Sequence, residues 1–130
     1  MRGEIQNRAR AKQLRDFTGL KFGNITPTDI DGYVEFRDKL HVWMEAKLEG
    51  EPLLRGQRLA LERACDAIAE TGRESIVLVL DHSTPPEEDI PFAICRVREY
   101  RYCKEWHEPL RPITCREAIC AMLDKIGMVL

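Results

Sequence analysis

Apolar and polar residues alternate from residue 30 to residue 49. Between Leu40 and Glu49, apolar or small side chains fall at even positions, and polar or aromatic ones fall at odd positions. Upstream, Ile30, Val34 and Phe36 follow the same parity. A period of two is typical of a β-strand with one face on a core. The polar residues 37–39 between the two runs have the length of a hairpin loop, so the pattern predicts a β-hairpin.

The register of this hairpin follows from its apolar faces. Directly opposed residues of an antiparallel pair share a face, and a slip of one residue turns one strand over. A three-residue loop centred on Asp38 places Asp31 opposite Glu45 and Asp29 opposite Lys47. A slip of two residues keeps the faces together but places Asp29 opposite Glu45, so Asp29 is an alternative to Asp31.

Either register gathers carboxylates and a lysine on one face of the hairpin. Opposed Cβ atoms lie about 4.5–5.5 Å apart, so two opposed carboxylates can share a cation. Mg²⁺ prefers oxygen ligands, and a lysine can hold a phosphate or steady an attacking water. Without a cation the carboxylates repel each other and one pKa rises. The pattern therefore predicts a metal-dependent phosphodiesterase. The alternative is a charged, solvated strand face, because charged residues make up 32% of the chain.

The rest of the chain predicts helices and further strands. A helix followed by an apolar strand predicts a crossover beside the hairpin, and hence a mixed sheet. A Thr-x-x-Glu capping box marks the start of the last helix. The expected elements are a first helix at Glu4–Phe17, a helix at Leu53–Ala69, a strand at Ser75–Leu80, a loop at Asp81–Pro91, a strand at Phe92–Tyr102 and a helix from Thr114 to Ile126.

Asp31, followed after thirteen residues by Glu45-Ala46-Lys47, resembles the core of the PD-(D/E)XK nucleases. That superfamily includes type II restriction enzymes, archaeal Holliday-junction resolvases and RecB-type nuclease domains. The order of helix, hairpin, helix and further strands is also similar, and the resemblance covers roughly residues 1–100. It implies an α/β, restriction-endonuclease-like three-layer fold, in which a mixed sheet of about four to five strands is flanked by helices. A single domain spanning residues 1–130 is expected.

The resemblance also implies an activity and the residues that carry it. Asp31 and Glu45 would hold Mg²⁺ or Mn²⁺ with help from the Ala46 carbonyl, and Lys47 would orient water or bind the phosphate. The reaction implied is hydrolysis of DNA phosphodiester bonds, with endonuclease and exonuclease action both open. The alternative function is a catalytically inactive nuclease-like domain that binds DNA or a protein.

Two further positions match features of the superfamily. Glu4 lies before Asp31 at about the distance where many resolvase-like members have a glutamate on the first helix, which makes it a candidate metal ligand. An acid in a first helical turn also complements the helix dipole without any metal. Gln57 resembles the glutamine with which RecB-like members position nucleic acid or the metal shell, although an exposed helical glutamine needs no function.

The net charge and the distribution of charges along the chain give different indications about its partners. The net charge of −2 provides no global argument for nucleic acid. Basic residues gather near the N-terminus, where Arg8 and Lys12 are candidate substrate contacts, and again between Arg96 and Lys104. Both groups suit phosphate contacts, and both also suit an ordinary solvated surface. DNA is the expected partner, and a homodimer is implied because many relatives act as dimers.

Other features set the expected environment. No apolar run approaches the ~20 residues that cross a membrane, and no signal-peptide core is visible, so a cytoplasmic protein without membrane contact is expected. Five cysteines without a CxxC pair suggest reduced, mostly buried thiols. A loose zinc set can be drawn from one Cys-x₃-His spacing and one Cys-x₄-Cys spacing, with ligands Cys103, His107, Cys115 and Cys120.

Three aromatic or imidazole side chains complete the candidates. His41 shares the face of Glu45 and is interpreted as a surface histidine. Trp43 lies on the same face, where it either stacks on a base or covers the core. His82 directly follows the buried strand, and strand ends often carry function in open α/β sheets.

Overall fold

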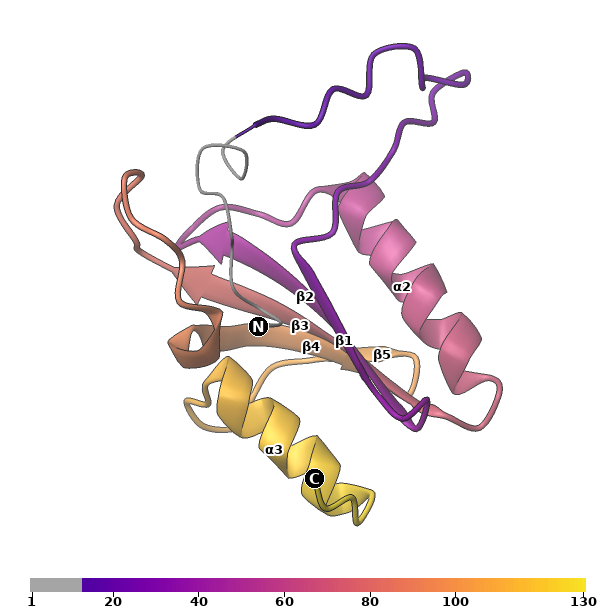
Figure 1. The fold of residues 1–130 in the computed structure, drawn as a ribbon, viewed down its shortest axis with the longest axis vertical. Helices are drawn as coiled ribbons and strands as arrows, with labels where there is room; N and C mark the ends of the chain where they lie inside the picture. Colours follow the sequence, from indigo (N-terminus) through magenta and orange to yellow (C-terminus); the bar gives the residue numbers. More distant parts are fainter. Residues whose placement is uncertain (1–12) are drawn as a thin grey trace.

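The structure is a computed structural model that describes residues 13–130. The protein is built around one five-stranded sheet of order β1-β2-β3-β4-β5. A helix packs on each face of the sheet, α2 on one side and α3 on the other (Figure 1). The predicted α/β class and mixed sheet are confirmed. The elements are β1 (Gly32–Phe36), β2 (Leu40–Leu48), α2 (Arg55–Ala69), β3 (Glu74–His82), a 3-10 turn η1 (Phe92–Ile94), β4 (Arg96–Tyr102), β5 (Glu105–His107) and α3 (Cys115–Lys125).

The predicted hairpin and its register are confirmed. β1 and β2 are antiparallel, with Gly32 opposite Met44 and Phe36 opposite Leu40. Residues 37–39 form the three-residue turn, in which Asp38 takes a φ of 58°. Because the even residues of both strands face the same side, only registers that preserve this parity bury the apolar set.

The crossover predicted from the helix and the apolar strand is also present. β2 and β3 are parallel neighbours, with Leu40 beside Glu74 and Leu48 beside His82. α2 connects them, and the turn that follows it contains Gly72, whose φ of +87° suits a residue without Cβ. The carboxyl ends of β2 and β3 therefore meet at one edge of the sheet, which in α/β folds is where ligands commonly bind.

The core has two parts, one on each face of the sheet. The even residues of β2 pack with β3, β4 and α3, whereas Trp43 packs on the other face with Leu61 and Cys65 of α2. The alternative of a charged, solvated odd face on β2 is therefore wrong. His41 is also not a surface residue, because only 7% of it is exposed. β2 is an inner strand, and α2 covers the face that the polar residues suggested would be open.

The last helix follows its sequence signals closely. The Thr114 hydroxyl accepts a hydrogen bond from the Glu117 backbone N–H, and the Glu117 carboxylate accepts one from the Thr114 N–H. This reciprocal capping box satisfies two amides that a helix start leaves without partners. The apolar side of this helix, which includes Met122, packs on the sheet.

Several boundaries differ from the sequence prediction. β3 continues through Asp81 and His82, which the sequence pattern assigns to a loop. The segment from Phe92 to Ile94 is a 3-10 turn rather than a strand, and Ile94 is 69% exposed. The sequence pattern does not predict β5. Its two-residue turn uses Cys103 and Lys104, both with positive φ, in place of the usual Asn-Gly signal.

The segment before β1 runs away from the sheet (Figure 1). Residues 13–17 have no helical structure, so the predicted first helix does not reach Phe17, and the rest of that prediction lies outside the described residues. Neither of the two described helices has the length and apolar character that crossing a bilayer requires.

Candidate active site

An open pocket of about 440 Å³ lies where the carboxyl ends of β2 and β3 meet. The hairpin, α2 and the loop after β3 all contribute to its wall. The structure thus brings together seven of the residues singled out from sequence, although they are spread over a long stretch of the chain: Asp29, Asp31, Glu45, Ala46, Lys47, Gln57 and His82.

The Asp31 carboxylate is held at the open end of the hairpin, opposite its turn. Asp31 directly precedes β1, and its Oδ2 accepts a hydrogen bond of 2.9 Å from the backbone N–H of Ala46. This bond continues the contact between the two strands beyond their last backbone pair. Asp29, like Asp31, lines the pocket, is exposed and precedes β1, but it has no such hydrogen bond with any residue from 13 to 130. Asp31 is therefore the better placed of the two alternatives.

Glu45 is the most buried acid at this site, with 3% of the residue exposed. Its Oε1 accepts a hydrogen bond of 3.1 Å from Gln57 Nε2 and lies 4.0 Å from Lys47 Nζ. Its Oε2 is buried and has no hydrogen-bond partner among residues 13–130. Burial, and then the negative charge of Asp31, raise the pKa of the Glu45 carboxyl to about 7, while the Lys47 ammonium acts in the opposite direction.

Gln57 lies in the first turn of α2 and is partly buried rather than a freely exposed glutamine. Its amide nitrogen faces Glu45, and its Oε1 lies 3.4 Å from the Leu54 backbone nitrogen. The side chain therefore connects the start of the helix to the middle of β2. It fixes the orientation of one carboxylate oxygen and leaves the other one open.

Glu45 Oε2 has no hydrogen-bond partner among residues 13–130, which leaves it open to a divalent cation. A buried carboxylate oxygen without a donor is costly, and a cation is one partner that removes this cost. Within residues 13–130 no group of three or more His, Cys, Asp and Glu side chains is arranged to hold a metal. Mg²⁺ commonly uses one or two carboxylates together with water and substrate phosphate, so two carboxylates and the Ala46 carbonyl fit Mg²⁺ or Mn²⁺.

Some of the predicted site residues cannot be placed. Glu4, Arg8 and Lys12 lie outside the described residues. The second basic cluster is described, and three of its members are neutralised within the fold. Arg98, Arg101 and Lys104 each pair with a carboxylate at 2.6–2.8 Å, so they hold elements together rather than present charge to a phosphate.

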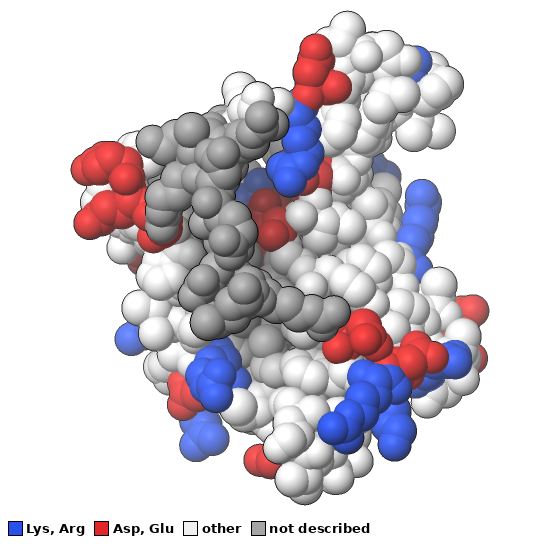
Figure 2. Space-filling model, viewed as in Figure 1, with Lys and Arg blue, Asp and Glu red and all other residues white. Residues whose placement is uncertain are grey.

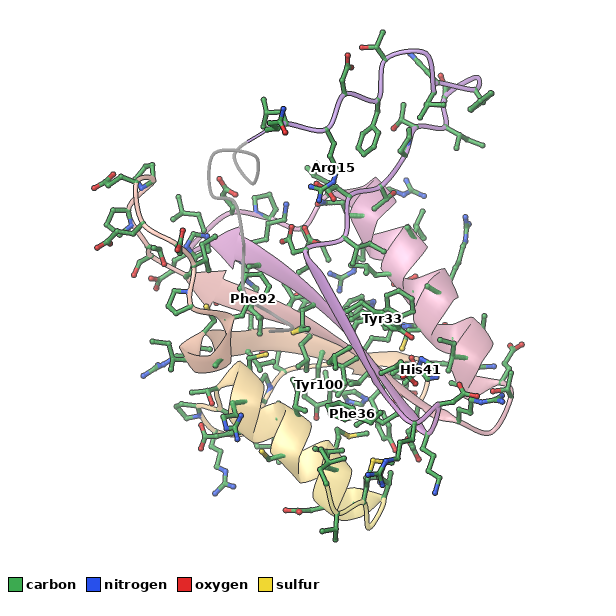
Figure 3. All side chains as sticks on the ribbon, in the orientation of Figure 1. Arg15, Tyr33, Phe36, His41, Phe92 and Tyr100 are labelled. Carbon is green, nitrogen blue, oxygen red and sulfur yellow. The ribbon has the colours of Figure 1, made fainter. Side chains whose placement is uncertain are left out.

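Two of the aromatic and imidazole candidates, Trp43 and His41, support the fold, whereas His82 lines the pocket. Trp43 belongs to the core and donates a hydrogen bond of 3.2 Å to Ser75 Oγ, so it covers the core. His41 contacts the Tyr33 hydroxyl (Figure 3). It also lies 2.8 Å from a carboxylate oxygen of Asp38, which is part of the hairpin turn. His82, in contrast, is the last residue of β3 and lines the same pocket as Glu45.

The loose zinc set is not assembled. Cys115 is buried in the core, with its Sγ 3.7 Å from Met44 Sδ, while Cys103 and Cys120 are exposed. Sequence reasoning also missed four pocket residues: Leu48, Glu51, Thr84 and Pro86. The backbone N–H of Thr84 donates to His82 Nδ1 at 3.1 Å. The Asp81-His82-Ser83-Thr84 run at a strand end was the available signal.

Comparisons of the chain with models of protein families, with curated proteins and with solved structures found no match. The chemistry of the pocket is therefore the basis for a functional assignment.

Proposed function

We propose that this protein is a Mg²⁺- or Mn²⁺-dependent nuclease of restriction-endonuclease-like fold that hydrolyses DNA phosphodiester bonds. One observation carries the proposal. Glu45 is a buried carboxylate with one oxygen lacking a partner, and Asp31 and Lys47 share its pocket. A buried acid with a raised pKa in a cleft is a typical feature of a functional site. The arrangement of strands and helices is compatible with the fold implied by the resemblance.

Asp31, Glu45 and the Ala46 carbonyl would hold the metal ion. When bound, the ion lowers the pKa of water and stabilises negative charge on the scissile phosphate. Gln57 holds Glu45 Oε1, so Oε2 would be the oxygen available to the ion. Lys47 is 15% exposed in its side chain and lies close to Glu45, which suits a cation that binds the phosphate or orients the attacking water.

The burial of Glu45 contributes to the chemistry of the site. Electrostatic interactions are stronger where water is excluded, so a carboxylate and an ammonium in this pocket act more strongly than on the surface. The hydrogen bond from Ala46 N–H keeps Asp31 beside Glu45 without competing for its second oxygen. Both carboxylates are thus positioned before any ligand binds.

A cleavage assay tests the proposal. Purified protein is incubated with supercoiled plasmid, single-stranded DNA and branched DNA in Mg²⁺ or Mn²⁺, and in EDTA. Wild type is expected to cleave at least one substrate only with metal. Glu45→Gln, Asp31→Asn and Lys47→Ala are expected to lose cleavage while keeping the wild-type circular dichroism spectrum.

Glu105→Gln is the matched control, because Glu105 is an exposed acid on β5 and lines no part of the pocket. Undiminished cleavage by Glu45→Gln would rule out the assignment. DNA binding without cleavage by wild type in either metal would support the inactive binding module instead.

A further inference from the structure

The active-site pocket continues beyond Glu45 along the edge of the sheet. His82 and Thr84 line this pocket and also a second pocket of about 470 Å³, which includes Glu49 and Arg96. Arg96 in turn lines a third pocket of about 490 Å³ at the start of β4. The three pockets adjoin one another at the sheet edge, because each shares lining residues with the next. We call them together the strand-end groove, defined by Lys47, His82, Thr84 and Arg96.

Arg96 differs from the other basic residues of its cluster. Arg98, Arg101 and Lys104 are all paired with carboxylates of the fold. The Arg96 side chain has no ion pair or hydrogen bond with any residue from 13 to 130, and the residue is exposed. An arginine left unpaired in a groove presents five N–H donors to an anion from outside.

His82 presents a donor in the same groove. Its Nδ1 accepts the backbone N–H of Thr84, so the proton of the neutral ring is on Nε2. Within the described part of the chain, Nε2 has no hydrogen-bond partner. The ring lines both the pocket of Glu45 and the pocket of Arg96, which places it between the candidate catalytic acid and the unpaired arginine.

Acidic residues limit where an anion can bind in the groove. Asp81 lines it but is neutralised by Arg98 at 2.6 Å, and Glu49 is exposed. The loop after β3 carries further acids at Glu87 and Glu88, and Figure 2 shows acidic side chains gathered there. On this face the basic side chains are scattered rather than continuous (Figure 2). An extended anion would therefore follow the line from Lys47 through His82 to Arg96.

We propose that the strand-end groove binds the backbone of one DNA strand next to the scissile phosphate. Arg96 pairs with a neighbouring phosphate, and His82 Nε2 donates a hydrogen bond to the backbone between Arg96 and Lys47. The nature of the ligand rests on the proposed nuclease function. A single line of donors matches one phosphate backbone rather than the two of a duplex, so a single-stranded segment is the substrate class that the groove accepts.

The test measures strand binding separately from cleavage. Binding of a fluorescein-labelled single-stranded deoxyoligonucleotide is followed by fluorescence anisotropy, with Ca²⁺ in place of Mg²⁺, at several salt concentrations. Arg96→Gln is expected to weaken binding about fivefold. The slope of log K against log salt should fall by about 0.7, the value for one phosphate contact on a single strand. Arg63→Gln, which removes an exposed charge of α2 outside the groove, should bind as wild type does.

A pair of substitutions separates the two nitrogens of His82. His82→Asn keeps an acceptor for Thr84 N–H but lacks a donor at the position of Nε2, so it should weaken binding. His82→Gln can place an amide donor near that position and should restore part of the affinity. Equal binding by Arg96→Gln and Arg63→Gln would overturn the inference, and so would a wild-type protein that binds no strand.

The outcomes also separate this inference from the proposed function. If wild type cleaves DNA and Arg96→Gln binds as tightly as wild type, the groove assignment fails and the nuclease assignment stands. If no protein cleaves and only the groove substitutions weaken binding, the nuclease assignment fails and the groove assignment stands.

Discussion

Gln57 Nε2 donates a hydrogen bond of 3.1 Å to Glu45 Oε1 and thereby joins the first turn of α2 to β2. One oxygen of Glu45 is satisfied by this bond, while Oε2 stays buried and without a partner. The orientation of the candidate metal ligand therefore depends on how α2 docks on the sheet. Gln57 is a positioning residue, because it acts through Glu45.

Gln57→Ala should weaken metal binding without unfolding the protein. Removal of a partner that orients a metal ligand typically costs about 10- to 100-fold in affinity or activity. Isothermal titration with Mn²⁺ measures the affinity, and initial rates at saturating metal measure the cleavage. Arg63→Ala on the same helix is the control. Unchanged affinity and unchanged rates in Gln57→Ala would show that Glu45 is oriented without it.

Glu45 should destabilise the metal-free protein at neutral and higher pH. The pKa of this acid is raised from 4.5 to about 7 in the folded state, so the folded state binds the proton more tightly than the unfolded state does. The stability that depends on this proton is fully present below the unfolded pKa and is lost as pH rises through about 7. Glu45→Gln should therefore raise the free energy of unfolding at pH 8, by on the order of 2 kcal/mol.

Urea denaturation in EDTA at pH 5 and pH 8 measures this effect. The difference in stability between wild type and Glu45→Gln should be larger at pH 8 than at pH 5. A variant that is less stable than wild type at pH 8 would mean that the Glu45 carboxylate has a stabilising partner in the free protein.

Divalent metal should reverse this destabilisation. Metal binding requires the deprotonated carboxylate, so the affinity for Mn²⁺ should rise as pH increases from 6 to 8, and binding should release protons. A ligand that binds only the folded state raises the apparent melting temperature. In thermal denaturation, Mn²⁺ should raise the melting temperature of wild type by an amount that depends on pH. It should leave the melting temperature of Glu45→Gln unchanged. An equal increase in both proteins would place the metal elsewhere.

The hairpin register and the last helix are predictable from sequence. Parity of the apolar positions permits few pairings of β1 with β2 and leaves Asp31 and Asp29 as the two acids that can lie opposite Glu45. The observed register selects Asp31. The capping box of Thr114 likewise marks the start of α3. Both signals are local, because the residues that carry them contact one another over a short stretch of chain.

Features that depend on the docking of distant elements could not be predicted. His41 and Trp43 are polar or amphipathic and suggest an open face, yet α2 covers that side of β2. The contact of Gln57 with Glu45 depends on the same docking. The turn at Cys103 and Lys104 adopts positive φ without a glycine, so no composition signal marks β5.

Arg98 and Arg96 lie two residues apart on β4, and we expect different effects on stability from replacing them. The Arg98 guanidinium donates to the Asp81 carboxylate at 2.7 Å and to the Glu51 carbonyl at 2.6 Å, so it ties β4 to the end of β3 and to the segment after β2. Arg98→Ala leaves the partly buried Asp81 without its cation and should lower the free energy of unfolding by about 2 kcal/mol. Arg96→Ala removes no side-chain hydrogen bond or ion pair among the described residues and should change stability by less than about 0.5 kcal/mol. Urea denaturation of both variants checks this order, and comparable losses of stability would show that Arg96 is also part of the structural framework.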